Sequence, residues 1–202
     1  MTKRVVLAAL LGGIAMFAWT SIAHMVLPLG ETGVKEIPNE QAALAALQTA
    51  IGQSPGFYFF PGMGLGPTAT NQQKSAAMDQ YGQKLAANPS GILIYHPPGA
   101  PPISARFFII EFLTELAGCF LAVFLLAQTR LATFGSRLVF VAAAGLMVSI
   151  MTNISYWNWY GFPTNYTLAY MFTQFVGFVV AGLIAAAMIK TEVPARSVAM
   201  AA

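Results

Sequence analysis

Charged residues are scarce in this sequence, and their scarcity indicates the solvent in which it folds. The chain of 202 residues contains 10 Lys and Arg and 7 Asp and Glu, so that 8% of it is charged while 57% is hydrophobic. A soluble domain has roughly a quarter of its residues charged. The composition therefore excludes an ordinary water-soluble domain and predicts an integral membrane protein.

Cysteine and histidine are almost absent as well. The single Cys119 cannot form a disulfide within the chain or build a cysteine-ligated zinc site. The Cys-x-x-Cys-His run of c-type haem is missing, and no Ser or Cys lies near a histidine in a pattern typical of nucleophilic catalysis. We therefore expect neither an enzyme nor a resident cofactor. The weaker alternative is a haem or metal site at His24 and His96.

Long apolar runs are what the sequence has instead. Residues 5–27, 104–128, 134–156 and 167–189 each reach the roughly 17 to 25 residues that an apolar helix needs to cross a bilayer. Backbone groups cannot stay unpaired in lipid, so each run is expected to be helical. The predicted fold class is an all-α integral membrane protein. It is a four-transmembrane-helix bundle with a small extracytoplasmic α+β cap between helices 1 and 2.

The basic residues predict the orientation of this layout. They flank the two termini and the turn near residue 130, as Lys3, Arg4, Arg130, Arg137, Lys190 and Arg196. Loops rich in Lys and Arg stay in the cytoplasm. The net charge of +3 is thus a topology signal, and because it forms no exposed basic patch we expect no nucleic-acid partner.

The division of the chain follows from these helices. Residues 1–27 form the first membrane helix, 28–103 the extracytoplasmic cap, 104–190 the other three helices and 191–202 a cytoplasmic tail. The first 23 residues also have the order of a cleaved secretory signal, with a basic start, an apolar middle and small residues at the end. We expect them to be retained as a membrane helix. The expected location is the inner (plasma) membrane of a bacterium.

The cap is expected to contain two helices and two short strands. Helical patterns cover residues 39–52 and 71–87, and aromatic or β-branched runs cover 57–60 and 91–95. A right-handed strand-helix-strand crossover would make the two strands parallel. Two strands alone are marginally stable, so the cap has to lean on the membrane helices or on a partner.

Two glutamates lie inside the second apolar run. Glu111 and Glu115 are four positions apart, which places them on one face of a helix. An ionised carboxylate facing lipid is costly, so we expect this face to turn inward, with Glu111 hydrogen-bonded to His24 or Asn153. By depth, the polar residues of all four helices gather in the outer half of the membrane. The expected intramembrane polar cluster is Glu111, Glu115, His24, Asn153, Tyr170 and Gln174.

Aromatic residues crowd the second outer connection. Trp157, Trp159 and Tyr160 fit the aromatic belt of a membrane surface, and together with Tyr95 and His96 they are candidates for a surface that binds a partner or a ligand such as a pigment or quinone.

Two functions remain open from the sequence. The first is an accessory, non-catalytic subunit of a larger membrane assembly of the respiratory or photosynthetic type, whose partners are the lipid bilayer and other membrane subunits. The alternative is a small carrier or ligand-binding membrane protein that uses Glu111 and Glu115 to handle protons or cations.

Overall fold

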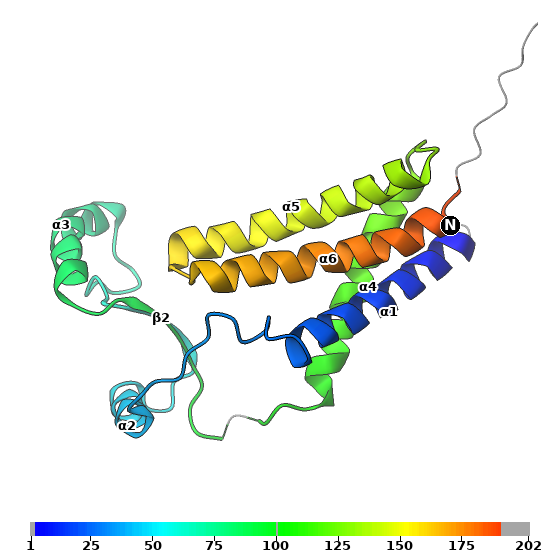
Figure 1. The fold of residues 1–202 in the computed structure, drawn as a ribbon. Coiled ribbons are helices and arrows are strands. Elements are labelled where there is room, and N and C mark those ends of the chain that lie inside the picture. Colours follow the sequence, from blue (N-terminus) through cyan, green and yellow to red (C-terminus); the bar gives the residue numbers. More distant parts are fainter. Residues whose placement is uncertain (1–2, 100, 191–202) are drawn as a thin grey trace, which may run out of the picture. The chain divides into compact units, whose positions relative to one another are not determined.

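The structure is a computed structural model that describes residues 3–99 and 101–190. In these ranges the chain forms six helices and two strands, in the order α1 (Lys3–Met25), α2 (Glu40–Ile51), β1 (Gly56–Phe60), α3 (Asn71–Ala87), β2 (Gly91–Tyr95), α4 (Ala105–Ala127), α5 (Phe134–Tyr160) and α6 (Thr164–Met188) (Figure 1). The chain divides into two compact units. The helical unit comprises Met1–Val34 and Ile103–Ala202, and the cap unit comprises Lys35–Pro102.

Four helices of the helical unit are long and apolar enough to cross a membrane. They are α1, α4, α5 and α6, with 23, 23, 27 and 25 residues and a mean hydropathy between 1.9 and 2.1. The prediction of four long apolar helices is therefore confirmed, and the largest differences in their bounds are at the end of α5 and the start of α6. The expected tail at 191–202 lies outside the described residues.

The connection between α5 and α6 is shorter than the sequence suggested. The helix α5 continues to Tyr160, and α6 begins at Thr164, so that residues 161–163 alone lie between them. Gly161 ends α5 in the left-handed conformation, with φ of 69°, and Pro163 precedes α6. The interpretation of Trp157 to Tyr160 as a loop was wrong, because aromatic side chains are tolerated in a helix and Gly161 is the first residue suited to stop it.

The four long helices do not contact one another equally. The helix α1 packs against α4 and α6, and α5 packs against α6, while α4 has smaller contacts with α5 and α6. Figure 1 shows α4 running obliquely to the other three. Consistent with this course, α4 buries Cys119, Val123 and Leu126 in its second half, whereas residues 105–111 are all exposed.

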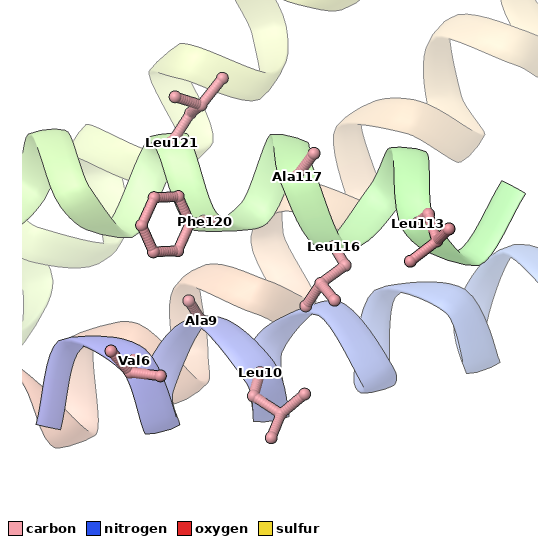
Figure 2. Close-up of a pocket in the computed structure, with 8 residues that line it drawn as sticks. All are labelled: Val6, Ala9, Leu10, Leu113, Leu116, Ala117, Phe120 and Leu121. Atoms are coloured by element: carbon pink, nitrogen blue, oxygen red, sulfur yellow. The ribbon is translucent and has the colours of Figure 1, made fainter. Parts of the chain in front are cut away.

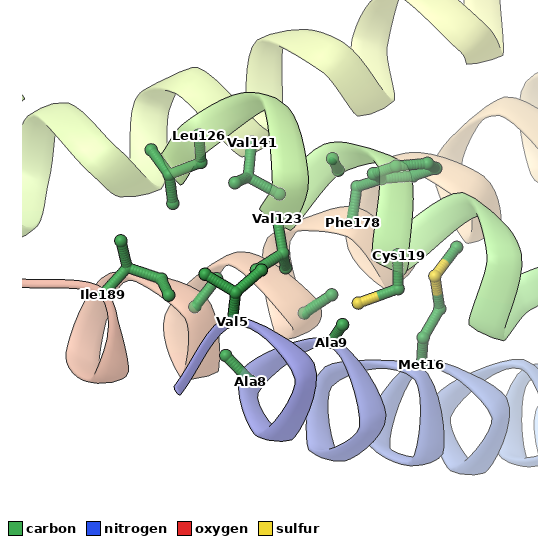
Figure 3. Packing of buried hydrophobic residues seen from close by; sticks show 13 residues of the cluster. Val5, Ala8, Ala9, Met16, Cys119, Val123, Leu126, Val141, Phe178 and Ile189 are labelled. Carbon is green, nitrogen blue, oxygen red and sulfur yellow. The ribbon is translucent and has the colours of Figure 1, made fainter. Parts of the chain in front are cut away.

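The apolar core lies near one end of the helical unit, where α1 begins and α6 ends. Val5 of α1, Leu126 of α4, Val141 of α5 and Ile189 after α6 belong to a single cluster of buried side chains (Figure 3). Alanines complete it, including Ala8, Ala9, Ala122, Ala181 and Ala185. These small side chains let the backbones approach closely, as is common between membrane helices.

Glycines mark the closest approaches. A Cβ added to Gly12 would lie 2.7 Å from the Sγ of Cys119 and 3.5 Å from the carbonyl oxygen of Ala181, so that Gly12 faces both α4 and α6. A Cβ added to Gly145 would overlap the Cβ of Phe178 on α6. At these two positions the contact between helices requires the absence of a side chain.

Arg137 is buried at the same end. Its Nε donates a hydrogen bond to the carbonyl oxygen of Ala186 at 3.1 Å, and one terminal nitrogen donates to that of Ala132 at 2.9 Å. The last carbonyls of a helix have no partner within the helix, and Ala186 lies in the last turn of α6. Arg137, which the sequence marked as a flanking charge, therefore joins α5 to the end of α6.

The cap unit contains the elements that the sequence predicts, but its strands pair antiparallel. Gly56 lies opposite Tyr95, and Phe60 lies opposite Gly91. The expectation of parallel strands was wrong because the connection returns to the end of β1 from which it left. The Nζ of Lys84, near the end of α3, donates a hydrogen bond to the carbonyl oxygen of Gly62 at 3.3 Å, so that β2 starts beside the end of β1.

The cap unit has almost no interior. Tyr95 is the one buried residue among its described positions, and its hydroxyl donates a hydrogen bond to the carbonyl oxygen of Gly52 at 2.9 Å. Neither α2 nor α3 has a buried residue. This arrangement agrees with the expectation that two strands and two helices of this size need external support.

The contact between α5 and α6 leads to a stability prediction with an internal control. We expect Gly145→Ala to lower the free energy of unfolding in detergent micelles by about 1–3 kcal/mol, because the new methyl group meets the Cβ of Phe178, which cannot rotate away. Gly118→Ala is the matched control, since the nearest atom to its new Cβ, also from Phe178, is 3.9 Å away. Equal stability of the two variants would contradict this packing.

Candidate functional site

A cavity of about 640 Å³ opens between the helices and borders the apolar core at Met16 and Phe178. We call it the acid cavity. Its walls come from α1, α4 and α6, with Val148 contributed by α5. Five of the six residues predicted as a polar cluster line it, namely His24, Glu111, Glu115, Tyr170 and Gln174. The sixth, Asn153, is connected to it through Gln174, as described below.

Glu115 is the buried member of the acid pair. Its side chain is 7% exposed, and the side chain of Thr20 on α1 is placed to hydrogen-bond the carboxyl group. The second carboxyl oxygen, Oε2, is buried and has no hydrogen-bond partner in the described part of the chain. A buried polar atom without a partner costs about 1–3 kcal/mol, and more if it is charged. This oxygen is therefore the position in the cavity at which a hydrogen-bond partner is missing.

Glu111 lies one helical turn earlier and is exposed. It lines the same cavity and is close enough to Glu115 for their charges to interact. The expected hydrogen bond from Glu111 to His24 or Asn153 was wrong, since neither side chain bonds it among the described residues. The helix α4 has few contacts with α5, which carries Asn153, and the Nδ1 of His24 is already hydrogen-bonded to the carbonyl oxygen of Thr20.

His24 faces the cavity from the last turn of α1. Its Nδ1 lies 2.9 Å from the carbonyl oxygen of Thr20, which can only accept, so Nδ1 carries the proton. The Nε2 atom is then left for a second interaction. The imidazole ring also meets Tyr170 edge to face, with ring centres 5.6 Å apart.

Asn153 and Gln174 join α5 to α6. The Asn153 side-chain amide donates hydrogen bonds to Gln174 Oε1 at 2.7 Å and to the carbonyl oxygen of Ser149 at 2.9 Å. The hydroxyl of Ser149 in turn donates to the carbonyl oxygen of Met171 at 3.0 Å. With its Oε1 occupied, Gln174 presents its amide nitrogen as the remaining donor.

Hydroxyl and aromatic side chains that the sequence analysis did not single out complete the walls. They are Thr20, Ser21, Thr114 and Thr173, together with Phe17, Phe107, Phe108 and Phe178. Their spacing contained a signal, since Phe107, Glu111, Thr114 and Gly118 follow one another at three or four residues on one face of α4. The faces of α1 and α6 could not be chosen in this way, because polar residues lie on more than one side of each.

The predicted aromatic surface is divided by the structure. Trp157, Trp159 and Tyr160 lie in the last turn of α5, where Trp159 is 78% exposed and the Nε1 of Trp157 donates to the hydroxyl of Thr164 at 3.1 Å. Tyr95 is buried within the cap unit, so its assignment to a contact surface was wrong. Its ring packs edge to face with that of Tyr58, which takes it out of the surface. His96 follows Tyr95 and is exposed.

A row of stacked rings leads from the end of α5 toward the acid cavity. Tyr156 contacts Tyr160 and Phe162, Phe162 contacts Tyr166, and Tyr166 stacks on Tyr170 with ring centres 4.4 Å apart. Tyr170 then lines the cavity beside His24. This row holds the C-terminal end of α5 against the N-terminal half of α6 and places the phenol of Tyr170 at the cavity wall.

A second groove, of about 550 Å³, lies between α1 and α4 and differs in chemistry (Figure 2). Its lining is entirely apolar, from Val6, Ala9, Leu10, Leu113, Leu116, Ala117, Phe120 and Leu121. Its lining residues offer no side-chain hydrogen-bonding group, in contrast to those of the acid cavity.

The described residues contain no cluster of side chains arranged to bind a metal ion. No three His, Cys, Asp or Glu side chains come together there in a way that could hold an ion. Comparisons with known proteins find no family model, no curated protein and no solved structure that matches this chain.

Proposed function

We propose that this chain is a multi-pass protein of a bacterial inner membrane, with both termini in the cytoplasm and the cap unit outside. The support is the gathering of basic residues near the apolar core. Lys3 and Arg4 begin α1, Arg130 and Arg137 flank the connection from α4 to α5, and Lys190 follows α6. Val5, Leu126, Val141 and Ile189 bring these ends together (Figure 3). Such an end faces the cytoplasm.

Cysteine labelling checks this orientation. With an impermeant maleimide added to intact cells, Asn71→Cys and Trp159→Cys are expected to react, whereas Thr133→Cys and Pro194→Cys are not. The unsubstituted chain is the control, because Cys119 is buried and leaves no background. Labelling of Thr133→Cys from outside would reverse the proposed layout.

The function we propose is that of an accessory, non-catalytic subunit that docks on other membrane proteins through its cap unit. One observation carries this proposal: Tyr95 is the single buried residue among the described positions of the cap unit. A segment of about this size cannot offset its conformational entropy without apolar burial. A partner that covers the cap supplies that burial, as expected for a subunit of a respiratory or photosynthetic type of assembly.

The β-ribbon offers the most apolar face for this contact. Phe57 lies opposite Ile94 and Phe59 lies opposite Ile92, so these four side chains share one face. Ile94 is 67% exposed, and Phe57 and Phe59 are about half exposed. We call these four residues the ribbon face. Large exposed apolar patches are typical of protein interaction sites.

Migration of the solubilised protein on native gels tests the ribbon face. We expect the unsubstituted chain, extracted from its own membrane in mild detergent, to migrate with other chains, and Phe57→Ser/Ile94→Ser to release it. Met78→Ser, which removes an equally exposed apolar side chain from α3, is the control and should leave the assembly intact. Migration of the unsubstituted chain alone, or release by the control to the same extent, would argue against docking through this face.

A second candidate function is the binding of a small ligand in the acid cavity. The observation that favours it is the cavity itself, which has a volume suited to a small organic molecule and polar groups on otherwise apolar walls. Such a protein would carry or retain its ligand in the outer half of the membrane.

A cavity-filling substitution separates this function from docking. In lipid nanodiscs, a neutral solvatochromic dye is expected to bind the unsubstituted protein saturably, and Gly118→Leu is expected to weaken binding at least tenfold because Gly118 lines the cavity. Gly135→Leu, at a glycine with no atom within 4 Å of its added Cβ, is the control. Unchanged dye binding in Gly118→Leu would show that the dye, and hence this function, does not use the cavity.

A further inference from the structure

We propose that the acid cavity selects an amphiphilic ammonium compound, with an N–H bearing cationic head at Glu115 and Glu111 and an apolar tail along the aromatic wall. This inference rests on the second proposed function and adds the chemical class of the ligand. It does not depend on the docking of the cap.

The cavity contains hydrogen-bonding groups that are not satisfied by the rest of the described chain. Glu115 Oε2 is buried without a partner, Glu111 presents a second carboxyl group, and the Nε2 of His24 remains after its Nδ1 has bonded Thr20. These groups chiefly accept hydrogen bonds. The Gln174 amide and the Tyr170 hydroxyl of the same cavity can donate, so the groups in need of a donor are the two carboxyl groups, and a complementary ligand places its donors there.

A second observation concerns charge. Among the residues that the structure describes, no Lys or Arg lines the acid cavity, although two carboxyl groups do. A carboxylate removed from water needs a compensating cation or has to take up a proton. A cationic ligand supplies the missing positive charge and the missing donor in one group, and charge-assisted hydrogen bonds of this kind are stronger than neutral ones.

The cavity is better suited to an organic cation than to a bare metal ion. In the part of the chain described by the structure, no three acidic, histidine or cysteine side chains converge on one point, so that the ligand groups of a metal are spread too widely. The volume of about 640 Å³ is also far larger than an ion requires. Phe17, Phe107 and Phe178 line the same space, and aromatic faces attract both alkyl chains and ammonium groups.

The entrance follows from the course of α4. Ile103 is 80% exposed and Phe107 and Phe108 are about half exposed, although all three line the cavity. The exposed Glu111 lies between this entrance and the buried Glu115. A ligand arriving from the outer half of the membrane thus meets one carboxyl group at the entrance and the second at the end of its path.

Calorimetry with ligands of matched chain length tests this inference. The probes are octylamine, octan-1-ol and octanoate, titrated at neutral pH into the full chain in zwitterionic nanodiscs and corrected with empty nanodiscs. We expect octylammonium to bind roughly tenfold or more tightly than octanol, and octanoate to bind most weakly. Octyltrimethylammonium, which lacks an N–H group, should bind more weakly than octylammonium.

Substitution assigns the preference to the carboxyl groups. Glu115→Gln preserves shape and is expected to abolish the discrimination between octylammonium and octanol, while Glu31→Gln, an exposed glutamate that does not line the cavity, should leave it unchanged. Glu111→Gln, at an exposed position that tolerates change, should reduce the preference and serves as the second variant if Glu115→Gln does not fold.

The same calorimetry separates a failure of the ammonium assignment from a failure of the second proposed function. Equal binding of the three octyl probes, or tightest binding of octanoate, would overturn the ammonium assignment and leave ligand binding intact. Equal affinity of octyltrimethylammonium and octylammonium would overturn the assignment of Glu115 Oε2 as the N–H acceptor. No saturable binding of any probe would overturn both the ligand class and the second proposed function.

Discussion

The burial of one carboxyl group in an apolar helix is the constraint on which the arrangement of the helical unit depends. The side chain of Glu115 is buried. Thr20 of α1 faces its carboxyl group, and the following turns of α4 are buried as well. Facing lipid, a carboxylate at this depth would cost several kcal/mol. The side of α4 that carries Glu115 must therefore turn toward α1 and α6, and Cys119, Val123 and Leu126 follow on that side at three- or four-residue steps.

The two ends of the helical unit are packed differently. Near the apolar core, glycine and alanine allow close contact, and Arg137 donates a hydrogen bond to the carbonyl oxygen of Ala186 in the last turn of α6, so that little space is left. Toward the other end, hydrogen bonds such as that between Asn153 and Gln174 hold α5 to α6, while α4 diverges. Polar contacts between a few side chains fix α5 and α6 without filling the space beside them. The cavity is the consequence of this difference.

Much of this fold was accessible from the sequence, and the missing parts have definable causes. Apolar length located the four long helices, and depth along them brought together Glu111, Glu115, His24, Tyr170 and Gln174, because residues at one level of parallel or antiparallel helices lie near each other. The depth of a residue along its helix does not show how the helices cross or which partners a side chain has, so the hydrogen bond predicted for Glu111 was wrong. The prediction of parallel strands in the cap was wrong. The handedness rule applies only to strands that are already parallel, and the loop after β1 allows β2 to pair antiparallel.

The chain order links the two units at the place where the cavity opens. The cap unit ends at Pro102, and Ile103 follows at the rim of the acid cavity, one turn before Phe107 and two before Glu111. One short stretch of chain, residues 103–111, thus carries both the covalent connection to the cap unit and three of the side chains that line the acid cavity, Ile103, Phe107 and Glu111.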